Sequence, residues 1–282
     1  MSLKNTTLRD IPAVRWLALG IVSFTMLAAS FTTDVMSPLK PMLQRELMWD
    51  SLDYGFFSSA YGWFNVFLFM LLFGGIILDR FGIRLTGKLA TGFMVAGALI
   101  KYWAISHTFA PASEVMGFKS SVFYAAVGYA VFGIGAEVAG ITVTKIIVKW
   151  FKGKELALSM GLQLALARIG TIMALAISAA VADYFSAVSA SVLLGVALLC
   201  IGFVSYFIYS FYDKRLDEQL DKEENGDEEE FRLQDIKQII TNKGFWLITL
   251  LCLFFYSGIF PFLKYASDLM VNKFHVNEQL AG

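Results

Sequence analysis

Charged residues are scarce in this chain: Asp, Glu, Lys and Arg together make up 16% of its 282 residues. A soluble globular domain carries roughly 25% charged residues, whereas 57% of this chain is hydrophobic. The composition excludes an ordinary soluble domain and indicates a protein embedded in a lipid bilayer. The formal net charge is +0 and the sequence has no basic block or stripe. It therefore predicts no nucleic-acid partner.

Cysteine is also rare, with only Cys200 and Cys252, and both lie inside apolar runs. They are interpreted as small core hydrophobes rather than a disulfide or a metal site. The chain has no His-Glu-x-x-His, no Gly-x-Ser-x-Gly and no phosphate-binding Gly-x-x-x-x-Gly-Lys-Ser/Thr. We therefore expect no enzyme, no catalytic residues, no metal and no cofactor.

Long hydrophobic runs are the abundant feature. A membrane-spanning helix needs about 20 apolar residues, and a span in lipid must satisfy its own backbone polar groups. The pattern does not alternate polar and apolar residues as a barrel would. The sequence therefore predicts an all-α membrane protein with seven spans, namely Ala13–Thr33, Tyr54–Leu78, Thr86–Ser106, Val122–Val148, Leu156–Tyr184, Ser189–Tyr212 and Phe245–Ala266.

Lys and Arg predict the orientation of these spans. About 16 of them lie on the side that carries the N-terminus, against about 4 on the other side. Because basic loops stay inside, we expect the N-terminus in the cytoplasm and, by default, a multi-pass protein of the cell (inner) membrane. Lys101 and Lys264 lie near the ends of spans, and we expect both to extend their ammonium groups to the outer interface.

The chain divides into three parts. Residues 1–212 hold six spans with short loops, and residues 213–243 form a polar, acidic connector that is expected to end in a short amphipathic helix. Residues 244–282 hold the seventh span. Six spans, a long cytoplasmic loop and a further span are the layout of the first part of a carrier with two six-helix halves. We expect a truncated carrier, and a natural seven-span protein is the alternative.

The loop between the second and third spans reads Asp79-Arg80-Phe81-Gly82-Ile83-Arg84, preceded by Gly75. It resembles the signature of the major facilitator superfamily, although the family often has Arg at the place of Ile83. Gly82 permits a tight turn, Asp79 can meet the positive end of another helix, and Arg80 and Arg84 hold the loop at the cytoplasmic side. The resemblance implies the six-helix N-terminal half of a major facilitator fold plus helix seven, with these residues as a cytoplasmic gate.

Two opposite charges lie in the middle of apolar spans, Glu137 and Arg168. An ionisable side chain at bilayer depth costs at least ~2.5–3.5 kcal/mol. At 1.5 Å per residue, Glu137 lies ~16 Å and Arg168 ~18 Å from the cytoplasmic ends of their helices, so the two are level near the midplane. They either form an internal salt bridge or bind a substrate that carries both charges. Arg suits a carboxylate because its planar fork donates two parallel hydrogen bonds.

The stretch from Glu137 to Gly170, with Trp150-Phe151-Lys152-Gly153-Lys154-Glu155-Leu156 inside it, is similar to the lysosomal dipeptide carrier group of the superfamily. The resemblance implies that Glu137 engages a peptide amino terminus and Arg168 a peptide carboxylate. It also makes a lysosomal membrane the alternative location if the source is eukaryotic. Tyr61 and Asn65 are expected to line the cavity, and Asp34 is a candidate for proton coupling.

Three functions follow from these features. The first is a secondary transporter of dipeptides or other small zwitterions by alternating access, driven by a gradient since no nucleotide site exists. The second is an organic-anion or nitrate-type carrier, in which Arg168 binds the substrate and Glu137 is its counter-charge. The third is a non-transporting half-carrier that acts as a membrane interaction partner. The expected partners are a small-molecule substrate, the lipid bilayer, and the missing C-terminal half or an accessory membrane protein.

Overall fold

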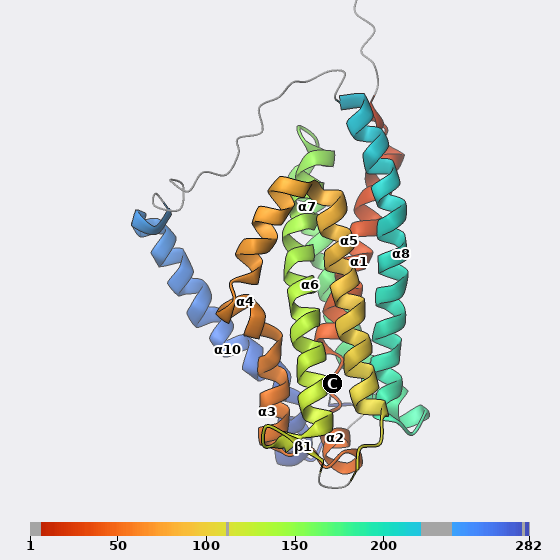
Figure 1. Ribbon diagram of the computed structural model, residues 1–282, viewed down its shortest axis with the longest axis vertical. Helices are drawn as coiled ribbons and strands as arrows, with labels where there is room; N and C mark the ends of the chain where they lie inside the picture. The colour runs from red at the N-terminus through yellow and green to blue at the C-terminus, as the bar shows by residue number, and fades with distance from the viewer. Residues whose placement is uncertain (1–6, 111–112, 221–238, 278–279, 282) are drawn as a thin grey trace, which may run out of the picture.

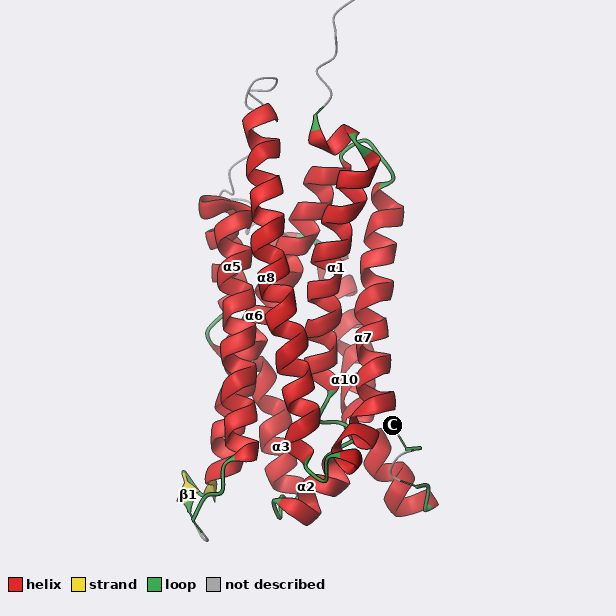
Figure 2. Ribbon diagram, turned by 90° about the vertical axis from the view of Figure 1, so that its right-hand side faces the viewer, coloured by secondary structure: helices red, strands yellow, loops and turns green. Residues whose placement is uncertain are grey.

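The computed structural model describes residues 7–110, 113–220, 239–277 and 280–281 as one elongated helical bundle (Figure 1). Figure 2 shows that the long helices run roughly along the long axis and that the short strands lie at one end. The described elements are η1 (Leu8–Asp10), α1 (Pro12–Asp34), α2 (Lys40–Glu46), α3 (Ser51–Ser59), η2 (Ala60–Gly62), α4 (Trp63–Phe67), α5 (Met70–Ser106), β1 (Glu114–Val115), β2 (Phe118–Lys119), α6 (Ser120–Phe151), α7 (Leu156–Tyr184), α8 (Val188–Leu220) and α10 (Lys243–Phe274).

The all-α membrane architecture is confirmed. Six helices of the described part are long and apolar enough to cross a membrane, when α5 is counted as one. The observed α1, α6 and α7 agree with the expected spans to within a few residues, and α7 coincides with its prediction at both ends. The sixth span continues past Tyr212 as α8, which runs to Leu220.

The helix α5 is two helices in sequence, because Gly82 inside it is not helical, with φ 75° and ψ 174°. A positive φ with an extended ψ is open essentially to glycine alone. Figure 1 shows the chain turning back on itself at the top of α5, so that its two parts correspond to the end of the second expected span and to the third. The turn that the sequence predicts at Gly82 is therefore present.

The second expected span, Tyr54–Leu78, is not one helix. It is divided among α3, η2, α4 and the first part of α5, and Phe69 between α4 and α5 has a left-handed backbone with φ 51°. The continuous span predicted from hydropathy is therefore wrong in this segment. The breaks turn the short pieces η2 and α4 against α6, where Ala60 packs with Ala126 and Ala130.

We call the two ends of the bundle the Arg84 end and the Asp34 end, each after a residue that lies there. The Arg84 end carries the start of α1, the connector between α6 and α7 and the end of α8. The Asp34 end carries the end of α1, the helix α2 and the antiparallel hairpin of β1 and β2, in which Glu114 pairs with Lys119. A buried apolar cluster lies toward each end, one around Tyr129 and Phe132 and the other around Trp150 and Tyr209.

The expected connector falls largely outside the described residues. Its acidic run and most of its expected amphipathic helix lie within residues 221–238. The next described element is α10. Its C-terminal part touches α2, whereas its N-terminal part lies away from the bundle (Figure 1).

Candidate functional site

Glu137 in the middle of α6 has a tyrosine as its partner. The hydroxyl of Tyr61 in η2 donates a hydrogen bond to Oε1 of Glu137 at 2.8 Å. The two elements come this close because residue 133 of α6 is glycine: a Cβ there would lie 2.2 Å from the carbonyl oxygen of Tyr61. Small residues permit such close approach of helices. The break in the second span thus brings two of the expected cavity residues together.

Asn65 lies one turn beyond Tyr61, in α4. Both polar atoms of its side chain, Nδ2 and Oδ1, are buried and have no hydrogen-bond partner among the described residues. A buried amide without partners is costly, and most such groups in proteins are satisfied by protein or by bound molecules. The arrangement is consistent with the expected position of Asn65 in a cavity wall, and its function stays a prediction.

Arg168 in α7 is exposed, and within the described ranges it has no hydrogen bond or ion pair. The helix that carries it packs closely on α1, since a Cβ on Gly170 would lie 2.2 Å from the carbonyl oxygen of Leu27. No ion pair joins Arg168 to Glu137 anywhere in the described part of the chain. The internal salt bridge that the sequence left open is therefore not formed among the described residues.

Asp34 at the end of α1 is held by two other helices. Its Oδ2 accepts a hydrogen bond from the Thr171 hydroxyl of α7 at 2.9 Å, and its Oδ1 forms an ion pair with Nζ of Lys264 in α10, also at 2.9 Å. Thr171 is three residues beyond Arg168, so both lie on one side of α7. Asp34 thus connects the helix of Arg168 with α10, whereas its role in proton coupling stays a prediction.

The expectation that Lys101 and Lys264 extend to the outer interface is wrong. Lys101 has no exposed surface, and its Nζ donates to the carbonyl oxygen of Thr32 at 2.9 Å beside the ring of Tyr129. Lys264 turns inward to Asp34 and also donates to the carbonyl oxygen of Thr33 at 2.7 Å. Buried ammonium groups need such acceptors, and here helix ends and one carboxylate supply them.

The residues of the expected cytoplasmic gate each contact a different partner. Asp79 forms an ion pair with Lys145 of α6 at 3.0 Å instead of meeting the end of a helix. Arg80 is exposed, with its guanidinium 5.6 Å from the ring of Phe81. Arg84 reaches α8, where its Nη2 lies 3.1 Å from Oδ2 of Asp217. The motif is thus anchored within the first six spans, and a lock against further helices stays a prediction.

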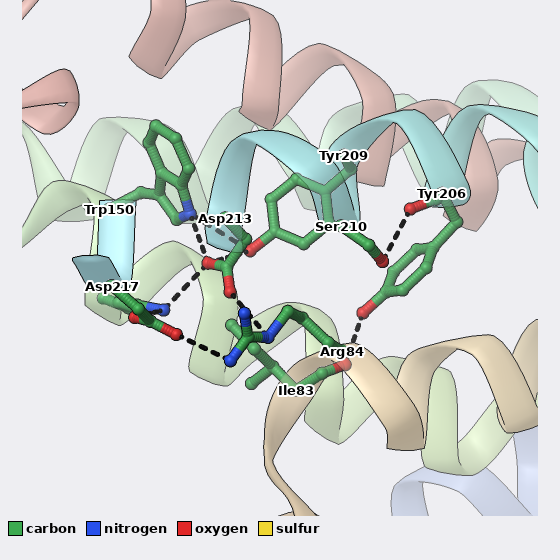
Figure 3. Close-up of polar contacts among 9 residues, drawn as sticks. Ile83, Arg84, Trp150, Tyr206, Tyr209, Ser210, Asp213 and Asp217 are labelled. Atoms are coloured by element: carbon green, nitrogen blue, oxygen red, sulfur yellow. Dashed lines mark hydrogen bonds and ion pairs between the residues drawn. The ribbon is translucent and has the colours of Figure 1, made fainter. Parts of the chain in front are cut away.

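Figure 3 shows the centre of this arrangement, Asp213 of α8, whose side chain has no exposed surface. Its Oδ1 accepts from Nζ of Lys149 at 2.9 Å, from Nε1 of Trp150 at 3.2 Å and from the hydroxyl of Tyr209 at 3.0 Å. Its Oδ2 lies 3.8 Å from Nε of Arg84. One buried carboxylate therefore ties α5, α6 and α8 together at the Arg84 end.

Several of these residues were not identified from the sequence. Asp213 directly follows the last aromatic residue of the sixth expected span, and for that reason it was assigned to the polar connector. A signal was present, because a carboxylate one turn after Tyr209 can reach that side chain if the helix continues. Thr171 gave no signal, since a threonine within an apolar helix usually bonds to its own backbone.

Comparisons with known proteins bear on the family of this chain. The Major Facilitator Superfamily matches residues 22–281. The lysosomal dipeptide transporter MFSD1 of Homo sapiens is 29% identical over 280 residues, which are 96% of this chain and 57% of that protein. The Bos taurus protein of the same name is 30% identical over 283 residues, or 96% of this chain and 56% of its own length. A probable chloroplastic anion transporter 4 of Oryza sativa subsp. japonica is 27% identical over 164 residues, covering 58% of this chain and 25% of that protein.

The chain spans just over half the length of the MFSD1 relatives that it matches. The match to the superfamily, in contrast, covers nearly all of the chain, including α10. It points to a transporter rather than an enzyme, and it agrees with a multi-pass helical membrane fold. The chain therefore belongs to the Major Facilitator Superfamily.

Proposed function

We propose that this chain is part of a secondary carrier that binds a dipeptide or another small zwitterion between Glu137 and Arg168 and moves it by alternating access. Glu137 receives the ammonium group, and Arg168 receives the carboxylate. The observation that carries the proposal is that these two opposite charges lie at mid-depth on consecutive helices and are not paired with each other. Such charges in a membrane protein mark substrate paths more often than they stabilise a fold.

The neighbouring residues suit these roles. Tyr61 orients the Glu137 carboxylate through one oxygen, which leaves the second oxygen for a substrate ammonium. Asn65 offers an unpaired amide whose carbonyl and NH₂ match a peptide bond. The guanidinium of Arg168 can hold a carboxylate with two parallel hydrogen bonds. The MFSD1 relatives, which are named dipeptide transporters, favour the same substrate class.

The proposed orientation places the Arg84 end in the cytoplasm. The excess of Lys and Arg near this end of the helices favours it. In this arrangement residues 1–212 are the first half of the carrier, residues 213–243 connect the halves, and residues 244–282 begin the second half. The membrane is the cell (inner) membrane, or a lysosomal membrane as the names of the relatives suggest.

Capped dipeptides test the role of each charge separately. The measurement is the ligand-induced rise in melting temperature of the full-length protein, with Ala-Ala, N-acetyl-Ala-Ala and Ala-Ala amide as ligands. In the unchanged protein, either cap should weaken binding by about 30-fold, or about 2 kcal/mol. In E137Q the acetyl cap should make no further difference, and in R168Q the amide cap should make none. If each cap weakens binding to E137Q and to R168Q as much as it weakens binding to the unchanged protein, the assignment of the two charges is refuted.

The second candidate is a carrier of simple anions, and a simple anion used as the ligand distinguishes it from a dipeptide carrier. Partial similarity to a protein named a probable anion transporter favours an organic-anion or nitrate-type carrier, in which Arg168 alone binds the substrate. Nitrate or a monocarboxylate would then stabilise the protein better than any dipeptide, and E137Q would retain that effect. Equal stabilisation by both ligand classes would leave Arg168 as the common anion site and remove the role of Glu137.

The third candidate is a non-transporting half-carrier that acts as a membrane interaction partner, and the exposed part of α10 bears on it. From Lys243 to Phe262 the helix is exposed throughout and largely apolar. The remaining helices of a carrier could pack on this surface and bury it. We propose that these helices, encoded downstream or supplied by an accessory membrane protein, complete the site. Sequencing the gene beyond the codon for Gly282 tests this: a stop codon there would favour a non-transporting interaction partner.

A further inference from the structure

The helix α10 touches the bundle at one end. Each residue from Lys243 to Phe262 is exposed, whereas those from Leu263 to Asp268 are partly buried and Ser267 is buried. The change follows Pro261, which removes a backbone hydrogen bond inside the helix and favours a bend there. Figure 1 shows the same division: α10 meets the bundle at the Asp34 end and diverges from it toward the Arg84 end.

Two ion pairs of opposite polarity make this contact. Nζ of Lys264 lies 2.9 Å from Oδ1 of Asp34, and Oδ2 of Asp268 lies 2.6 Å from Nζ of Lys40. The four side chains are largely buried, from 2% exposed for Lys40 to 19% for Asp268. Because residues four apart lie on one face of a helix, α10 presents a cation and an anion one turn, or ~6 Å, apart.

The alternation of charge specifies one register. If α10 moved by one turn in one direction, Lys264 would face Lys40, and in the other direction Asp268 would face Asp34. Both shifts bring like charges together in a poorly hydrated contact, where repulsion is strong. The end of α10 is therefore either docked in the observed register or separated from the bundle, which is the behaviour of a two-state contact.

Aromatic side chains complete the docking surface. The ring of Tyr265 lies 5.4 Å from that of Tyr54 in an edge-on arrangement, and Nζ of Lys40 lies 5.0 Å from the Tyr265 ring. The hydroxyl of Tyr54 donates to the carbonyl oxygen of Lys264 at 3.3 Å. These rings lie against the ion pairs, whose side chains are at most 19% exposed, so loss of one partner would leave an uncompensated charge in a poorly hydrated contact.

The docked end lies next to the proposed substrate residues. Nζ of Lys264 is 3.3 Å from the hydroxyl of Tyr129, whose ring lies 5.4 Å from that of Tyr61, the partner of Glu137. On the other side Asp34 bonds to Thr171, one turn from Arg168. Separation of α10 would therefore expose the substrate residues from the Asp34 end.

We propose that Lys264 and Asp268 are positioning residues of an outer gate, which closes the substrate site at the Asp34 end through their pairs with Asp34 and Lys40. The proposal rests on the proposed function, since a gate requires a transported substrate. In the observed conformation α10 is docked at this end through both ion pairs, whereas its residues from Lys243 to Phe262 are exposed toward the Arg84 end. Substrate release to the outer side requires that both ion pairs break.

A rearrangement of the four charges tests the gate without a substrate. Spin labels are attached at Glu114→Cys and Lys273→Cys, both exposed at the Asp34 end, in a background with Cys200→Ser and Cys252→Ser, and the distance between them is measured in lipid nanodiscs. The variant K264D/D268K keeps the composition and opposes like charges at both positions. We expect its distance distribution to become longer and broader, with the separated fraction raised by about tenfold or more.

The compensating variant decides whether charge pairing is the cause. D34K/K40D/K264D/D268K restores both pairs with reversed polarity, and it should return the distribution to that of the unchanged chain. K264R keeps the positive charge, so this single variant should give the distribution of the unchanged chain without any second substitution. An unchanged distribution in K264D/D268K, or a folded compensating variant that stays separated, would overturn the gate. Because the measurement needs no ligand, a failure to bind dipeptides would reject the proposed function and leave this result unaffected.

Discussion

The hydroxyl of Tyr61 donates to Oε1 of Glu137 at 2.8 Å and so joins the interrupted second span to the middle of α6. The contact gives a physical reason for the interruption. A continuous helix from Tyr54 to Leu78 would place its residues at regular 100° steps, whereas the separate pieces η2 and α4 let Tyr61 meet the acid while its carbonyl oxygen packs on Gly133.

Replacing Tyr61 by Phe removes this hydrogen bond and keeps the ring. We expect Y61F to weaken dipeptide binding by about fivefold, or about 1 kcal/mol, because the Glu137 carboxylate loses the donor that orients it. Isothermal titration of the full-length protein measures the change. Phe132 lies 6.3 Å from the Tyr61 ring and has no hydroxyl to donate to Glu137, so F132L serves as the matched control with unchanged affinity. Tighter binding in Y61F would show that Tyr61 competes with the substrate.

Replacing Asn65 by Leu should separate stability from binding. The side-chain amide is buried without partners, and an apolar group of similar shape removes its desolvation penalty of about 1–3 kcal/mol. We therefore expect N65L to raise the melting temperature by about 2 °C or more and to reduce the additional rise produced by a dipeptide. A lower melting temperature in N65L without ligand would mean that the amide has a partner in the membrane-embedded protein.

Replacing Gly82 by Ala tests the turn within α5. Nothing lies within 4 Å of a Cβ at this position, so the effect would come from the backbone alone, whose φ is 75°. We expect G82A to destabilise the protein by about 1–3 kcal/mol. Gly161 in α7 is equally open but helical, so G161A should be neutral or stabilising by up to about 1 kcal/mol. Unfolding in detergent mixtures measures both, and equal effects would contradict a strained turn.

Hydropathy and loop chemistry could predict much of the fold. The start of α7 is predictable because the polar connector around Gly153 interrupts an otherwise apolar sequence, and Gly153 has a positive φ of 74° there. The interruption at Phe69 could not be found in this way. Its left-handed backbone lies within a run of aromatic and aliphatic residues whose hydropathy is the same for a straight and for a broken helix.

The charges of the site illustrate a second limit. Glu137 and Arg168 were identified because depth along a helix follows from residue counting. Lys264 was misassigned because a lysine near the end of an apolar span has the same local sequence whether it reaches the interface or a buried carboxylate. Its partner Asp34 lies 230 residues earlier in the chain. Only the packing of α10 on the end of α1 selects between these outcomes.

Replacing Asp213 by Asn tests the charged cluster at the Arg84 end. The side chain is fully buried and is the shared partner of Lys149 and Arg84, which are 23% and 38% exposed. Loss of its charge leaves both cations near each other with Asp217 as the remaining counter-charge. We expect D213N to destabilise the protein by about 2–4 kcal/mol, below the full cost for a dry ion pair because both cations are partly hydrated.

The matched control is D217N, since Asp217 pairs with the same two cations but is 31% exposed. A hydrated pair of this kind contributes about 0–1 kcal/mol, so the two variants should differ clearly in an unfolding titration. Equal destabilisation by the two variants would place the stabilising interaction in the whole network of charges rather than in the buried carboxylate of α8.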